Sequence, residues 1–362
     1  MSDKKEIKNL INLTEIDFQK RGLIGNEEEF INRTDVHSII SANFGRLSDH
    51  WFKFATAWNH NAYQTFMDMD KYLILIYLVQ KSFRHYADIL IIHSEEQFYT
   101  KEEFEIEKIN LIEISEELKI AKETVRRKIN ELNRDQIITR KGKKIVLQPL
   151  TFIHQRPKHS IKAISIFLAA CSKYLATQDW FGDSIEPKEI DNFIRTNFTL
   201  IWRFFFRFKI PFLIRQRIFH GDLETFIVAG TIFANHIQRL RDKYKNKPIM
   251  METKVNDLGE SNYLKWARFI IKSKEPIIGM NASSISEITG IPRATVIRKL
   301  RLTEKKGLLH KDKQQLYTIG RNYKSRLKDL ERVFTENQID LCKFVTTFFE
   351  LYRNKNLNKN IK

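Results

Sequence analysis

Two segments of the sequence combine basic side chains with the spacing of an amphipathic helix. In residues 122–132, apolar Val125, Ile129 and Leu132 recur every three or four residues and would face a core, as Val296 and Leu300 would in the second segment. The opposite face of the first segment presents Lys122, Glu123, Arg126, Arg127 and Asn130, and that of the second presents Arg293, Ala294, Ile297, Arg298 and Arg301. Side chains of these types on the first turns of an exposed helix can contact base edges in the major groove of DNA. The pattern therefore predicts two DNA-contacting helices.

Charge is concentrated around both segments. Residues 121–144 hold nine Lys or Arg and three Asp or Glu, and residues 292–313 hold eight and two, so each stretch carries a net charge of +6 in a chain of net charge +18. A solvated helix surface usually mixes both signs, so this concentration favours a polyanionic partner, and nucleic acid in particular. Two predicted hairpin loops extend the basic surface with further candidate DNA contacts: Arg140, Lys141, Lys143, Lys144, Lys311 and Lys313.

The same sequence argues against nucleotide-binding enzymes that use glycine-rich loops. Glycine is scarce, 12 in 362 residues, and neither a G-x-G-x-x-G nor a G-K-[ST] loop is present. The acidic pairs Asp68/Asp70 and Asp222/Glu224 could be metal ligands of a nuclease, but acids at these positions more simply begin helices. The two cysteines, Cys171 and Cys342, have no metal-ligand spacing and are interpreted as buried thiols. We therefore predict no catalytic residue, no metal site and no cofactor.

The sequence also resembles itself. Residues 114–138 align with residues 285–309 at an offset of 171 with eight identities, and residues 36–44 align with residues 190–198 at an offset of 154. The difference between the offsets predicts an insertion in the second copy, within residues 245–275. Self-similarity on this scale indicates a duplicated architecture. The predicted fold is mainly α with small β wings, a tandem duplication of a helical half followed by a winged helix-turn-helix.

Local signals support the helix-turn-helix in each copy. In the second copy, Ser284 and Glu287 fit a capping box that would begin a short helix, and Gly290 can adopt the left-handed conformation that ends it. The next helix ends near Gly307, and residues 309–312 and 315–319 are predicted strands around a polar tip. The first copy follows the same plan with Lys119 in place of the glycine. A non-glycine residue there predicts a strained turn or a turn of different shape.

These motifs resemble known winged-helix regulators. Residues 285–300, with Gly307-Leu308-Leu309 and Tyr317-Thr318-Ile319-Gly320, resemble the DNA-binding domain of IclR-family regulators. Residues 124–129, with Gly142-Lys143-Lys144-Ile145, look more like that of the cyclic-AMP receptor protein family. The resemblance implies that Arg293, Ala294 and Thr295 open the second recognition helix and that Arg298 faces phosphate, with Lys122, Glu123, Thr124 and Arg127 as counterparts in the first. Because neither an effector domain nor a cyclic-nucleotide barrel is recognisable, no ligand chemistry is transferred, and a small-molecule effector stays undetermined.

The predicted organisation has five parts: an N-terminal arm (1–35), a first module (36–150, with helical half 36–94 and winged helix 108–150), a connector helix (151–189), a second module (190–320, with helical half 190–245 and winged helix 262–320) and a C-terminal amphipathic helix (321–362). The glutamate-rich residues 95–107 are interpreted as a solvated link. The run Phe204-Phe205-Phe206 cannot bury all three rings on one helical face, so contact with another domain or subunit is expected there. A homodimer through the aromatic helical halves is one such contact.

The leading prediction is a sequence-specific protein for double-stranded DNA, most consistent with a transcriptional regulator that uses two winged helices in one chain. A plasmid- or phage-type replication initiator is the alternative within nucleic-acid binding, and a nucleic-acid enzyme or a protein-docking role are alternatives from other classes. No signal peptide or membrane-length apolar segment is evident, so we expect a cytoplasmic location and no membrane partner.

Overall fold

The computed structural model describes residues 33–89, 91–106, 109–141, 144–177, 183–243, 278–320 and 327–360. Within these ranges the protein is mainly helical with two small antiparallel sheets, which confirms the predicted fold class at that level. Most of the predicted N-terminal arm, the predicted insertion at residues 245–275 and the start of the second predicted winged helix lie outside the described residues.

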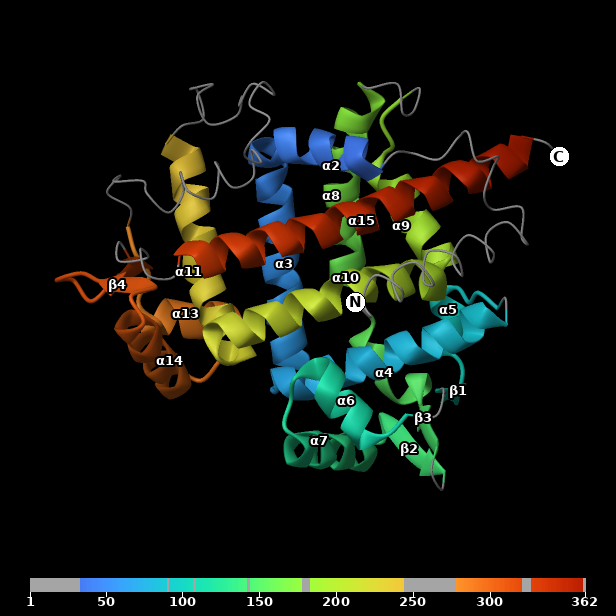
Figure 1. Cartoon of the computed structure of the whole chain (residues 1–362), viewed down its shortest axis with the longest axis horizontal. Coiled ribbons are helices and arrows are strands. Elements are labelled where there is room, and N and C mark those ends of the chain that lie inside the picture. Colours follow the sequence, from blue (N-terminus) through green and yellow to red (C-terminus); the bar gives the residue numbers. More distant parts are fainter. Residues whose placement is uncertain are drawn as a thin grey trace.

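Two sets of three helices form the centre of the molecule (Figure 1). The first set, the first helical half, comprises α2 (Arg33–Ala42), α3 (Phe44–Phe66) and α4 (Met69–Asp88), and the second helical half comprises α9 (Pro187–Thr196), α10 (Phe198–His220) and α11 (Leu223–Lys243). Each helix of the second half begins 154 residues after its counterpart in the first. Because α4 packs against α10 and α3 packs against α11, the two halves interlock.

Two further helices join the halves from outside. Helix α8 (Lys158–Ala176) packs against α3 and α9, and the long C-terminal helix α15 (Leu327–Asn360) packs against α10 and α2. Each of them therefore contacts both helical halves. Figure 1 shows α15 crossing in front of α3 and α8, with α10 running below it. Cys171 on α8 and Cys342 on α15 are buried free thiols, as predicted.

The aromatic core corrects one expectation. Phe204, Phe205 and Phe206 are all buried, because α10 runs through the middle of the bundle and neighbouring helices cover it on several sides. The Phe205 ring centre lies 4.7 Å from that of Trp58 on α3. The Phe206 ring stacks on Phe83 of α4 with centroids 6.5 Å apart. The partners of this run are thus other helices of the same chain, and the rings that motivated a homodimer are already buried within it.

The glutamate-rich segment is also not a solvated link. It forms the short helix α5 (Glu95–Tyr99) and the strand β1 (Phe104–Glu105), and the side chains of Phe98, Tyr99 and Phe104 are buried. Glu95 is buried as well and forms an ion pair with Arg195 of α9. The charge of Glu95 is neutralised by a residue 100 positions away, which the local composition could not indicate.

Two helix-turn-helix units extend from this bundle. The first unit comprises α6 (Leu111–Leu118), α7 (Lys122–Arg134), β2 (Ile138–Lys141) and β3 (Lys144–Leu147), and the second unit comprises α13 (Ala282–Thr289), α14 (Arg293–Lys305), β4 (Leu309–Lys311) and β5 (Tyr317–Ile319). Helices α13 and α14 and strand β4 each begin 171 residues after α6, α7 and β2. Both hairpins are antiparallel, and β1 extends the first to three strands in the order β1-β3-β2. After β3, the short 3₁₀ helix η2 (Pro149–Gln155) connects the first unit to α8.

Candidate nucleic-acid interface

Helix α7 presents the polar face that its sequence predicts. Val125, Ile129 and Leu132 are fully buried. The exposed residues among the predicted contacts are Lys122, Glu123, Arg126, Arg127 and Asn130, while Thr124 is half-buried. The side chains of Arg126 and Arg127 are 62% and 68% exposed, so both guanidinium groups are accessible to a partner.

Helix α14 presents a similar surface in the second unit. Val296 and Leu300 are fully buried. Arg293, Ala294, Arg298 and Arg301 are exposed, while Thr295 and Ile297 are half-buried. The polar faces of both helices therefore lie on the surface, where a large partner can contact them.

The turns that precede α7 and α14 are built alike. Lys119 and Gly290 both adopt the left-handed conformation, with φ of 56° and 74°, so Gly290 ends its helix as predicted and Lys119 takes the strained form of the turn. A serine one turn earlier stabilises each turn: Ser115 Oγ donates to the carbonyl of Ile120, and Ser286 Oγ donates to that of Ile291, both at 2.7 Å.

The helix start in the second unit differs from the prediction. Helix α13 begins at Ala282, and its N-cap is Asn281, whose side chain accepts a hydrogen bond from the backbone N–H of Ser284 at 2.8 Å. Ser284 is thus inside the first turn, and the predicted capping box with Glu287 is wrong. Asn110 caps α6 in the same way by accepting from the N–H of Glu113 at 2.9 Å. Asparagine is as good an N-cap as serine, so the sequence pattern alone did not separate the two positions.

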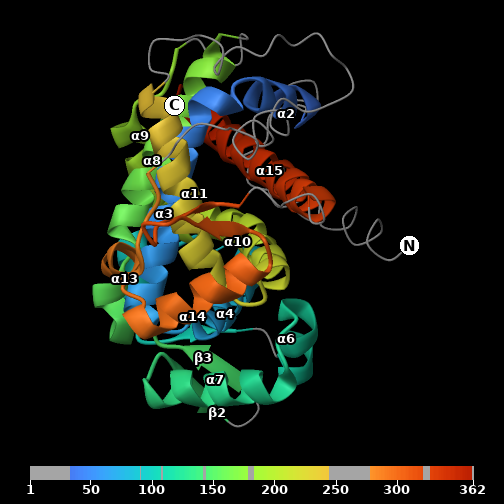
Figure 2. The ribbon, with the colours of Figure 1, turned by 90° about the vertical axis from the view of Figure 1, so that its left-hand side faces the viewer.

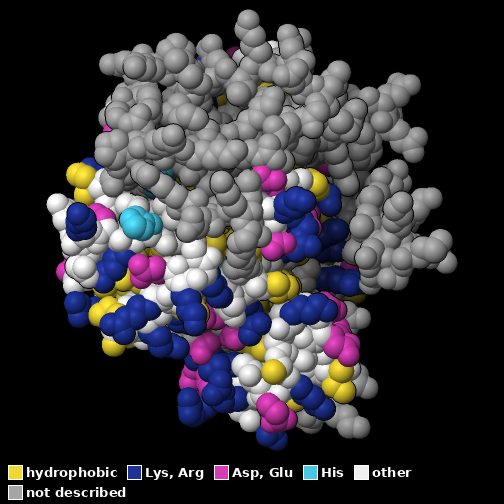
Figure 3. Space-filling model, turned by 60° about the vertical axis from the view of Figure 1, so that its left-hand side comes forward, with side chains coloured by type: hydrophobic (Ala, Val, Ile, Leu, Met, Phe, Trp, Pro, Cys, Tyr) yellow, Lys and Arg dark blue, Asp and Glu magenta, His cyan; other side chains and the backbone are white. Residues whose placement is uncertain are grey.

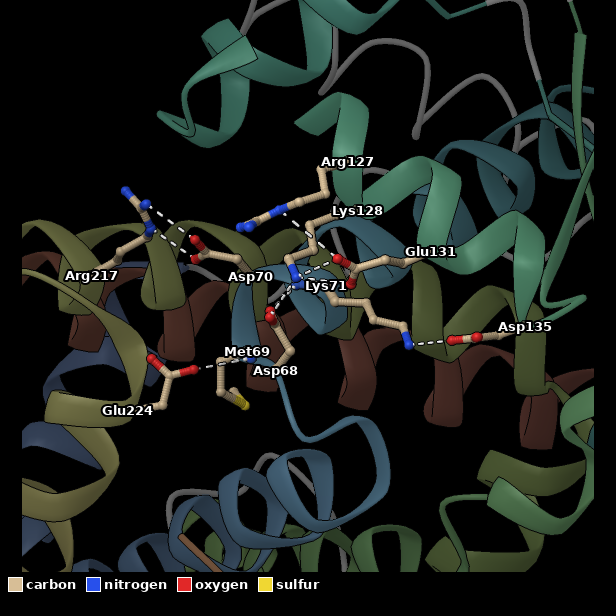
Figure 4. A network of polar contacts seen from close by, with 10 residues as sticks. All are labelled: Asp68, Met69, Asp70, Lys71, Arg127, Lys128, Glu131, Asp135, Arg217 and Glu224. Carbon is tan, nitrogen blue, oxygen red and sulfur yellow. Dashed lines mark hydrogen bonds and ion pairs between the residues drawn. The ribbon is translucent and has the colours of Figure 1, made fainter. Parts of the chain in front are cut away.

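A buried lysine fixes each exposed helix to its helical half, and sequence analysis missed both residues. Lys128 of α7 forms an ion pair of 2.7 Å with Asp68, the N-cap of α4 (Figure 4). Lys299 of α14 forms the equivalent pair with Asp222, before α11, at 2.5 Å. Both lysine side chains are only 8% exposed. A signal was available, because Lys128 and Lys299 are identical in the self-alignment, as are Asp68 and Asp222.

The aspartates also begin their helices, as the sequence predicted. Asp68 accepts from the N–H of Lys71 at 2.8 Å, and Asp222 accepts from that of Thr225 at 2.7 Å. Burial by itself would lower the pKa of Lys128, but hydrogen bonds to Asp68 and Glu131 outweigh it and raise that pKa above the ordinary value. Burial likewise acts to raise the pKa of Asp222, and hydrogen bonds from Lys299 and Thr225 lower it on balance. Lys128 and Asp222 are therefore both charged at neutral pH.

The predicted hairpin cations differ in their surroundings. Arg140, Lys141 and Lys144 are exposed, although Lys141 pairs with Glu103 at 2.6 Å, and Lys143 lies outside the described residues. In the second hairpin Lys313 is exposed, whereas Lys311 is half-buried with its ammonium 5.5 Å from the centre of the Tyr317 ring.

Both exposed helices lie on the lower side of the molecule, α14 at the left and α7 at the bottom in Figure 1, and both remain visible from the left-hand side in Figure 2. Figure 3 shows Lys and Arg side chains gathered over the lower part of the described surface, interspersed with fewer acidic ones. A polyanion that approached this side of the molecule would therefore meet a surface rich in cations.

Residues 105–142 match the DeoR-like helix-turn-helix domain. The match spans α6, α7 and β2, and it supports a winged helix-turn-helix DNA-binding domain at this position. The finer resemblances to the IclR and cyclic-AMP receptor protein families stay predictions. No curated protein and no solved structure matched the chain.

Two general features of the described residues bear on partners. None of their helices combines the length and the apolar character needed to cross a bilayer. Within the same residues, no three His, Cys, Asp or Glu side chains come together as metal ligands would.

Proposed function

We propose that this chain is a sequence-specific regulator of transcription that binds one DNA duplex through two winged helices, the first unit and the second unit. The first unit is supported by the domain match. The second rests on its likeness to the first: α14 has the same start relative to its turn, the same buried lysine–aspartate pair and the same kind of exposed basic face as α7. The constant offset of the two sets of elements supports their interpretation as copies of one module.

In this proposal α7 and α14 each enter a major groove with their N-terminal turns. The hairpin cations at Arg140, Lys144 and Lys313 approach the neighbouring backbone. Two such helices held by one rigid bundle contact half-sites about 10 bp, or roughly 34 Å, apart. Single-chain proteins with two such helices need no dimerisation for this geometry, which agrees with the burial of the aromatic halves inside the chain.

Charge removal at each unit tests the proposal. The variants are Arg126→Ala/Arg127→Ala in the first unit and Arg298→Ala/Arg301→Ala in the second, with binding to a fluorescent duplex measured by anisotropy at several salt concentrations. Each variant is expected to bind about tenfold more weakly and to reduce the slope of log K against log salt by about 0.9 for each phosphate that the variant no longer neutralises.

Lys173→Ala/Lys188→Ala is the matched control, since both residues are exposed and lie on α8 and α9, away from α7 and α14. This control should bind like the unmodified protein. Equal affinity of all three variants would contradict the proposal, and a loss confined to the first-unit variant would remove the second winged helix from it.

A further inference from the structure

The two exposed helices share their buried residues but differ at the positions that face outward. With the offset of 171 residues, the half-buried Thr124 and Thr295 correspond, as do the exposed Arg127 and Arg298. The positions that differ in chemistry are Glu123 against Ala294, Arg126 against Ile297, and Asn130 against Arg301. The shared arginine at Arg127 and Arg298 suits phosphate, so discrimination between bases falls to the positions that differ.

Glu123 and Ala294 make the clearest contrast. A carboxylate on the first turn can accept a hydrogen bond from the N4 amino group of cytosine, whereas a methyl side chain can only contact the C5-methyl group of thymine. Glu123 is 73% exposed, and its Oε2 lies 2.6 Å from an Nη atom of Arg126. The first helix thus presents an acceptor beside a guanidinium donor that suits guanine. The second presents apolar Ala294 and half-buried Ile297 at the same places.

Contacts across the bundle fix the two units relative to each other. Arg217 of α10, in the second half, donates to Asp70 at 2.9 and 3.2 Å (Figure 4). It also donates to the carbonyl of Lys119 in the first unit's turn at 3.0 Å. In the opposite sense, Gly290 in the second unit's turn lies against Gln64 of α3, where an added Cβ would come within 2.9 Å of Cγ. Each turn therefore lies against the long helix of the other half, and packing of α13 and α14 on α3 and α11 fixes the second unit to the bundle.

We infer that the two units read unlike half-sites, so that the chain binds non-palindromic DNA in one orientation and at one spacing. This inference rests on the proposed function. The segment under α7 contains cytosine and guanine at the positions facing Glu123 and Arg126. The segment under α14 contains thymine at the positions facing Ala294 and Ile297. A symmetric dimer of identical units would instead read the same sequence twice.

Selection of binding sequences from random duplex DNA by the full chain tests the inference. The expected result is a bipartite motif whose two segments differ, occur in one order and keep one spacing. Recovery of a palindrome or a direct repeat of one segment would overturn the inference but leave the proposed function standing, as would segments found at many spacings. Failure to enrich any sequence would overturn the proposed function and this inference together.

Two substitutions then assign the segments to the units. Glu123→Ala should reduce the preference for cytosine over thymine about tenfold at one position of one segment and leave the other segment unchanged. Ala294→Glu should do the reverse, moving one position of the other segment from thymine toward cytosine. Glu186→Ala, which removes the same charge at an exposed position before α9, is the control and should change neither preference. A change in both segments, or in neither, would contradict the assignment.

Discussion

The first and second units bury the same contacts and expose different ones. In both, an asparagine caps the first helix, a serine hydroxyl bridges the turn and a lysine of the exposed helix pairs with an aspartate of the bundle. At the surface, Glu123 and Arg126 face solvent where the second unit has Ala294 and Ile297. Removing one partner of a buried ion pair leaves a desolvated charge, while changing an exposed side chain costs little stability. The bundle thus constrains how each helix is held, and the surface is free to differ in what it contacts.

The turns show the same contrast within a few residues. Lys119 and Gly290 have nearly the same backbone conformation, but only the second is a glycine. At Gly290 a side chain would meet Gln64, whereas Lys119 is exposed and the opposite half contacts its carbonyl, through Arg217. The difference in residue type therefore follows from what the opposite half places beside each turn.

The largest expected effect on stability comes from breaking the lysine–aspartate ion pair that both units contain. Lys128→Met and Lys299→Met each leave a half-buried aspartate without its cation, so each should lower the free energy of unfolding by on the order of 2 to 3 kcal/mol. Urea denaturation measures the loss, and Lys305→Met, at an exposed position of α14, is the control. Adding Asp68→Asn to Lys128→Met should recover part of the stability, since asparagine still caps α4. A loss below about 1 kcal/mol in either single variant would refute the shared role.

Replacing a third buried lysine, Lys209, should raise the free energy of unfolding at neutral pH instead of lowering it, because no carboxylate among the described residues pairs with this lysine. Lys209 of α10 donates to Asn59 Oδ1 at 3.0 Å, and burial lowers its pKa to about 7. Between pH 7 and pH 9 the unfolded chain holds a proton that the folded chain has released, so stability rises with pH, by about 2 kcal/mol for this group.

Urea denaturation of the protein and of Lys209→Met at both pH values measures this contribution. The variant should be more stable than the unmodified protein at pH 7 and should lose most of the rise toward pH 9. Lys173→Met, exposed on α8, should keep the rise. If the free energy of unfolding of Lys209→Met rose equally between pH 7 and pH 9, Lys209 would not be the source of the pH dependence.

Giving the second turn a side chain has a smaller expected effect. Gly290→Ala introduces a Cβ at φ of 74° and 2.9 Å from Gln64 Cγ, so it should destabilise the protein by about 1 to 2 kcal/mol. Part of the loss should return in a Gln64→Ala background, where the close contact is absent. Identical losses in both backgrounds would leave backbone strain as the whole cost.

The reciprocal change at the first turn should have the smallest effect and the opposite sign. Lys119→Gly relieves the left-handed strain, but it also adds chain entropy to the unfolded state, so a net gain of about 0.5 kcal/mol is expected. The thermal unfolding midpoint is a suitable measurement. A loss of more than about 1 kcal/mol would mean that the Lys119 side chain makes a contact that the turn requires.

Features set by neighbouring residues could be predicted from the sequence. The 3.6-residue spacing located the buried face of α7 at Val125, Ile129 and Leu132, and Gly290 located the turn, because both depend on local backbone geometry. The exposed cations of α7 followed from the same spacing.

Features set by residues that are distant in the sequence could not be predicted in this way. The burial of Glu95 depends on Arg195, and that of Phe204, Phe205 and Phe206 depends on the central position of α10. The hydrogen bonds of Arg217 to Asp70 and Lys119 join segments that sequence analysis had no means to bring together. The burial of Lys128 and Lys299 likewise depends on aspartates from other elements, and the only sequence signal for it was the identity of both lysines and both aspartates in the self-alignment.

Hydroxyl-radical footprinting of the full chain on a selected duplex tests the central claim most directly, when combined with a measurement of how many chains bind. One chain should protect two patches about one helical turn apart on the same face of the duplex. Arg126→Ala/Arg127→Ala should weaken protection of one patch, and Arg298→Ala/Arg301→Ala should weaken the other. A single patch per chain, or two patches that appear only when two chains bind, would contradict the claim that one chain contacts DNA through two winged helices.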